Sequence, residues 1–95
     1  MTEDERLQML KMEIPISTNA FDKQLKFQLS AAQELIGREG ITLDLDSSHE
    51  DNIIVIQYAA FLFKKKRDPG IEFPKHLRIM MNNRLFSQKA GGGHV

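Results

Sequence analysis

The sequence predicts an all-α protein: a small helical bundle with two long antiparallel helices, two shorter helices and a flexible C-terminal tail. Residues 52–67 join a long apolar run to a short basic one, which is typical of a buried helix that ends at the surface. Residues 20–39 repeat apolar side chains at helical spacing. The stretch 41–46 alternates apolar and polar residues, but it has no partner strand, so we expect it to be a loop tucked beneath the helices.

The central helix is predicted from its two ends as much as from its middle. Ser47 or Ser48 can cap its start, because a short hydroxyl accepts a free backbone N–H. Eleven uncharged residues, 53–63, are followed by the basic run 64–67. Basic residues in a last turn complement the helix dipole, and Pro69 stops the helix soon after.

Two other interpretations of the central run are weaker. Residues 53–56 are β-branched and could form a buried strand, but the length of the run and its flanks favour a helix. A membrane span needs about twenty apolar residues, and this run has about half that number. Because the helix is apolar on almost every side, and the chain has only 95 residues, we expect other subunits to cover part of it.

The remaining helices are marked by caps and prolines. Thr2 and Glu5 have capping-box spacing, which predicts a helix over residues 3–13. The last helix is expected over 74–87, with Pro74 at its first position. We therefore expect one helical domain over 1–88 and a flexible glycine-rich tail over 89–95.

Eight apolar residues at helical spacing are predicted to form the core. They are Leu25, Leu29, Ile36, Ile54, Tyr58, Phe61, Leu77 and Met81.

Composition indicates a folded domain with no disulfide bonds. The chain is 41% hydrophobic and 27% charged, and it has no cysteine, which also excludes thiolate metal sites. Its first residues do not resemble a secretory signal, so we expect a cytoplasmic protein. Residues 1–51 hold eleven acidic and five basic side chains, whereas 52–95 hold two acidic and eight basic ones. Such a split favours head-to-tail stacking of copies, or neutralisation of one half by the other within a monomer.

No catalytic constellation is present in the sequence, so we expect neither an enzyme nor a cofactor. His49, His76 and His94 lie in three separate segments without the spacing of a zinc motif. Asp44 and Asp46 lie in an acidic loop that lacks the glycine and ligand spacing of a calcium-binding loop. A metal-binding or enzyme subunit is therefore the weakest interpretation.

A basic cluster suggests a partner instead. Its members face either DNA phosphates or an acidic protein, and they are Lys64, Lys65, Lys66 and Arg67. A small helix-turn-helix-like regulator is the alternative, because Asn82, Asn83, Arg84 and Gln88 are polar residues of the kind that read base edges. The link over 68–74 is long for the short turn of that motif.

The chain resembles the head–tail connector (adaptor) proteins of tailed phages over roughly residues 20–88. The resemblance is carried by Glu50-Asp51-x-x-Ile54-x-x-Gln57-Tyr58-Ala59 and Leu77-Arg78-x-Met80-x-Asn82-Asn83-Arg84-Leu85-Phe86. It implies an all-α subunit without an active site that forms a homo-oligomeric ring, commonly twelvefold in the virion. DNA passes through such a ring beneath the portal.

The same resemblance implies partners and a location. The partners are further copies of the chain, the portal protein, a downstream stopper or tail protein, and packaged DNA in non-specific contact; no membrane is involved. The expected location is the head–tail junction of the virion, after assembly in the cytoplasm of a host bacterium. By this resemblance the portal-contacting arm begins with Arg84, Leu85, Phe86, Ser87, Gln88 and Lys89.

Overall fold

A computed structural model describes residues 1–92 of the chain, with side chains as far as residue 90. Over this range the protein consists of four α-helices and no strand, which confirms the predicted all-α class. The helices are α1 (Glu3–Glu13), α2 (Asp22–Arg38), α3 (His49–Arg67) and α4 (Lys75–Gly92).

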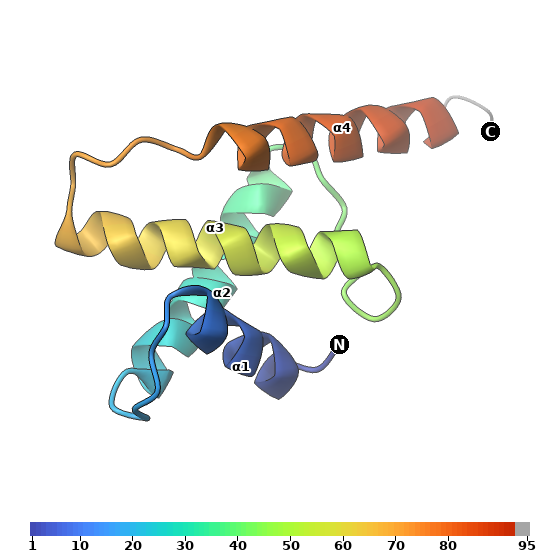
Figure 1. The fold of residues 1–95 in the computed structure, drawn as a ribbon. Helices are drawn as coiled ribbons and strands as arrows, with labels where there is room; N and C mark the ends of the chain where they lie inside the picture. Colours follow the sequence, from blue (N-terminus) through green and yellow to red (C-terminus); the bar gives the residue numbers. More distant parts are fainter. Residues whose placement is uncertain (93–95) are drawn as a thin grey trace.

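Helix α3 lies in the middle of the protein and contacts all three other helices (Figure 1). Figure 1 shows α4 running back beside α3 in the opposite direction, with α1 on the other side of α3. Helix α2 crosses behind α3, so these two helices are not the antiparallel pair that we expected. Helices α2, α3 and α4 have 17, 19 and 18 residues and α1 has 11, so three helices are long rather than two.

Two helix starts follow the predicted capping chemistry. Thr2 caps α1 in a complete capping box with Glu5, and the side chain of Ser48 accepts the N–H of Asp51 at the start of α3. Helix α2 has no side-chain cap. The loop before α3 is extended and places Ile41 in the core, as expected for a segment that tucks beneath the helices.

The core joins all four helices. Its apolar members are at most 9% exposed and are Leu7, Leu10, Leu25, Leu29, Ala32, Ile36, Ile41, Ile54, Val55, Ile56, Tyr58, Ala59, Ala60, Phe63, Leu77 and Met81. Seven of the eight expected core residues are among them. Phe61 is the exception: it is only partly buried and lies edge-on to Tyr58 and Phe73 at the rim of the core.

The apolar run of α3 is covered by the chain itself, which corrects an expectation from the sequence. Most of its apolar residues are buried, and only Ile53, Phe61 and Leu62 stay partly exposed. We expected neighbouring subunits to cover this helix because 95 residues seemed too few to do so. The crossing of α2, together with α1 and α4 on opposite sides, covers it within one subunit.

Two further features differ from what the sequence suggests. Phe27 is a large apolar residue within the helix predicted over 20–39, but its side chain is 69% exposed. The last helix continues to Gly92 rather than ending near residue 87, so residues 89–92 of the expected tail are helical. The rest of that tail, residues 93–95, lies outside the described residues.

Candidate interaction surfaces

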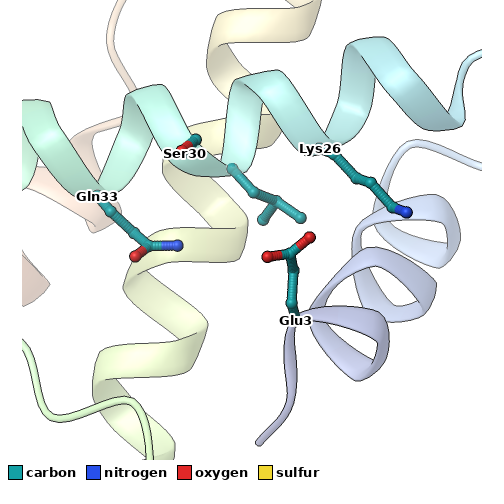
Figure 2. Close-up of a pocket in the computed structure, with 5 residues that line it drawn as sticks. Glu3, Lys26, Ser30 and Gln33 are labelled. Atoms are coloured by element: carbon teal, nitrogen blue, oxygen red, sulfur yellow. The ribbon is translucent and has the colours of Figure 1, made fainter.

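Within residues 1–92, no three histidine, aspartate or glutamate side chains come together in a way that could hold a metal ion. A groove between the start of α1 and the middle of α2 has a volume of about 90 Å³, well below the 300 Å³ or more of ordinary ligand pockets. Figure 2 shows the carboxylate of Glu3 pointing into this groove, with Lys26 and Gln33 on either side.

None of the four helices has an apolar stretch long enough to cross a lipid bilayer, as far as residues 1–92 are concerned.

The basic cluster lies at the end of α3 and all four of its side chains are exposed. Two of them are held by neighbours: the guanidinium of Arg67 lies over the rings of Phe21 and Phe63, and Lys65 donates to the carbonyl of Pro69. In the described chain none of the four forms an ion pair with a carboxylate. The cluster is therefore a positive surface available to an anionic partner.

Arg84 holds α4 against the start of α3. Its Nε donates to Asp51 Oδ1 at 2.7 Å, and its Nη2 donates to Asp51 Oδ2 at 3.2 Å and to the carbonyl oxygen of Thr42 at 2.8 Å. The side chain of Asp51 is fully buried and that of Arg84 is 21% exposed. A two-point contact between an arginine and a buried carboxylate is among the stronger polar interactions in proteins.

Asp51 stays ionised in this buried position. Burial alone raises its pKa, because a charged carboxylate loses solvation. The hydrogen bonds from Arg84 and from the backbone N–H of Asp44 outweigh this effect, so the pKa of Asp51 is lowered from its ordinary value. The pKa of Arg84 is raised for the matching reason, since its hydrogen bond to Asp51 favours the charged guanidinium.

Gln88 adds a second attachment one turn further along α4. Its side-chain amide donates to the carbonyl of Gly40 and accepts the N–H of Thr42, both at 2.8 Å. Gly40 has a φ of +98°, a backbone conformation that glycine adopts without strain. We call Arg84, Gln88 and their contacts to residues 40–51 the α4 clasp.

The clasp divides the six residues that were expected to begin a portal-contacting arm. Arg84, Leu85 and Gln88 face the body of the protein, where Leu85 packs against the core. The other three side chains, Phe86, Ser87 and Lys89, are exposed. The sequence showed that these six residues are adjacent, but not which of them turn inward, because the partners of Arg84 and Gln88 lie more than 30 residues earlier.

The clasp also bears on the helix-turn-helix interpretation. Two of the four polar residues that could read base edges, Arg84 and Gln88, are occupied by contacts within the chain. Asn82 and Asn83 remain exposed. In Figure 1, α4 runs back beside α3, whereas the helices of that motif cross at a steep angle.

Five large apolar side chains lie outside the core, and this exposed set was not predicted from the sequence. They are Met9, Met12, Phe27, Ile79 and Phe86, with exposed fractions from 44% to 75%. They lie on α1, α2 and α4. Three of them, Met9, Ile79 and Phe86, are adjacent in sequence to apolar residues that pack in or against the core, so the apolar pattern alone did not separate them from it.

Comparison with protein-family models, with curated proteins and with solved structures finds no match to this chain.

Proposed function

We propose that the chain is a non-catalytic assembly protein of the kind that connects head and tail in tailed phages, and that it forms a ring through which DNA passes. The observation that carries this proposal is the exposed basic cluster at the end of α3, whose four charges have no acidic partner within residues 1–92. Phosphates in a DNA channel need no base contacts, only positive charge at the surface.

The distribution of charge along α3 supports the same proposal. The opposite end of α3 is acidic, because Glu50 and the loop residues Asp44 and Asp46 are exposed there. The loop lies beside the start of α1, where the Met1 ammonium donates to the carbonyl of Leu45. A subunit that carries an acidic surface and a basic surface in different places can bind further copies through unlike surfaces and close into a ring.

The resemblance supplies the remaining parts of the proposal. The partners are the portal protein, a downstream stopper or tail protein, further copies in a ring that is commonly twelvefold, and packaged DNA. The location is the head–tail junction of the virion, after assembly in the host bacterial cytoplasm. The exposed residues Phe86, Ser87 and Lys89 are the part of the expected arm that can reach a partner protein, whether the portal or a further copy, without breaking the clasp.

The test is deletion of the gene from the phage or prophage that carries it. We expect DNA-filled heads and free tails to accumulate without joining, and expression of the chain from a plasmid to restore joined particles. Normal yields of infectious particles after deletion would refute the proposal. Portal, protease and capsid genes immediately upstream are expected in the genome.

A DNA-binding regulator is the second candidate, favoured by the exposed Asn82 and Asn83 beside the basic residues of α4. Binding of the purified chain to random and to selected duplexes separates the two functions. Equal, salt-sensitive binding to all sequences agrees with a DNA channel. A preference of a thousandfold or so for one sequence would establish the regulator instead.

A further inference from the structure

We infer that copies of this chain associate through two different helices, with α4 of one copy docking on α1 of the next. The inference rests on the proposed self-assembly and adds which surfaces meet. It starts from four of the five exposed apolar side chains: Met9 and Met12 on α1, and Ile79 and Phe86 on α4.

Each helix presents these side chains as a straight seam. On α4 the exposed residues Lys75, Ile79, Asn82, Phe86 and Lys89 follow one another at steps of four and three, which places them on one face. We call this set the α4 seam. The spacing is that of helices that pack side by side in coiled coils, where steps of three and four keep one face toward the partner.

The seam on α1 is shorter and follows the same rule. Glu5, Met9 and Met12 are exposed and are separated by four and three residues, and Glu13 lies one turn beyond Met9. We call these four residues the α1 seam. Met12 is 73% exposed and Phe86 is 75% exposed, so neither seam is covered within the subunit.

The two seams carry opposite charge. Helix α1 has two basic residues, but both are turned inward: Arg6 is 8% exposed and donates to Asn52, and Lys11 is 7% exposed and pairs with Asp22 at 2.8 Å. The exposed charges of α1 are therefore all acidic.

Helix α4 shows the converse. It contains no acidic residue, and two of its four cations are used within the chain, Arg78 on Glu39 and Arg84 on Asp51. The remaining cations, Lys75 and Lys89, lie at the two ends of the α4 seam and are exposed. An apolar seam flanked by acids thus matches an apolar seam flanked by bases, which favours a second copy of the chain as the partner.

The placement of the seams excludes contact between them inside one subunit. Helices α1 and α4 do not pack on each other, and α3 lies between them (Figure 1). A contact between different surfaces on opposite sides leaves one of each kind free at the ends of every pair, so association continues into a ring or a filament. A helix of 11 residues buries less surface area than a standard stable protein–protein interface. Each contact is therefore weak, and the fraction of associated chains rises with protein concentration.

Three exposed substitutions test the inference by sedimentation velocity at concentrations up to about 1 mM. Met12→Asn disables only the α1 seam, Phe86→Asn disables only the α4 seam, and Phe27→Asn is the matched control on α2, outside both seams. We expect the wild type and Phe27→Asn to form species larger than dimers. Each seam variant alone should remain monomeric, with a helical circular dichroism spectrum like that of the wild type.

Mixing the two seam variants gives the decisive result. The intact α4 seam of the Met12→Asn chain can bind the intact α1 seam of the Phe86→Asn chain, and no further chain can be added. We expect a one-to-one dimer that weakens as salt is raised, because the flanking charges are exposed. A mixture that stays monomeric, or one that grows beyond a dimer, would overturn the inference.

Two further outcomes separate this inference from the proposed function. If the wild type assembles and both seam variants assemble equally well, the two seams are not the contact surfaces, while the proposed assembly function stands. A wild type that is monomeric at 1 mM also overturns the pairing of α1 with α4, since this contact needs only copies of the chain. Gene deletion tests the proposed function independently of either result.

Discussion

Replacing Arg84 with methionine tests whether the α4 clasp stabilises the fold. The change removes both hydrogen bonds to Asp51 and the one to the carbonyl of Thr42, while methionine keeps much of the aliphatic volume. Asp51 is then left as a fully buried carboxylate whose remaining partner is the N–H of Asp44. Breaking a buried pair by removing one partner costs about 3–5 kcal/mol of unfolding free energy. We expect about 3 kcal/mol, because Arg84 is 21% exposed and water can reach the vacated space.

The loss should depend on pH in a defined direction. In the wild type the pKa of Asp51 is lowered, so its stabilising effect is complete above the ordinary aspartate pKa of about 3.9 and is lost as pH falls through the lower, folded value. In the variant, burial without Arg84 raises the pKa of Asp51, so the carboxylate takes up a proton at higher pH. The difference in stability is therefore largest near neutral pH and shrinks below about pH 4.

Urea denaturation followed by circular dichroism measures both effects. Arg78→Met is the matched control, because it is the same substitution on the same helix, but the Arg78–Glu39 pair is about two-fifths exposed. Exposed pairs contribute about 0–1 kcal/mol, so this variant should lose little. If Arg84→Met lost less than about 1 kcal/mol at pH 7, or no more than Arg78→Met, the clasp would not be a stabilising contact.

Other substitutions test the core rim, the basic cluster and the first cap. Phe61→Ala should lower the free energy of unfolding, measured by urea denaturation, by about 1–2 kcal/mol. Phe63→Ala should lower it by roughly 3–5 kcal/mol, because Phe63 is 5% exposed whereas Phe61 is only partly buried. Equal losses would place Phe61 in the core. Changing Lys64 and Lys66 together to serine should alter the free energy of unfolding by less than about 0.5 kcal/mol but weaken binding to duplex DNA in a filter assay. If the variant unfolded instead, the basic cluster would have a structural role. Thr2→Ala should cost about 1 kcal/mol through loss of the α1 cap, and an unchanged melting temperature would contradict this.

Local features of the fold were predictable from the sequence because their causes are local. The capping box of Thr2 and Glu5, the Ser48 cap and the stop after Arg67 each depend on a few adjacent residues. Seven expected core residues are buried for a related reason, since helical spacing identifies an apolar face.

Features that depend on distant residues were not predictable in the same way. The cover over α3 depends on how α2 crosses it, which no spacing within α2 specifies. Phe27 lies between the buried residues Leu25 and Leu29 in the sequence of α2, yet its own side chain is 69% exposed. The position of Arg84 depends on Asp51, 33 residues earlier, so the sequence offered it as a surface cation when it is a partner of a buried acid. Glycines near the end of α4 suggested a tail, whereas the helix continues to Gly92.

The contacts of Gln88 have a consequence for the order in which the protein matures on the ribosome. This side chain bonds to Gly40 and Thr42, which are 48 and 46 residues earlier in the chain. While the polypeptide is being synthesised, the first three helices can pack together, but the backbone of residues 40 and 42 lacks these two hydrogen bonds until residue 88 is available. A protease should therefore cut near residue 42 faster in a chain truncated before residue 88 than in the finished chain.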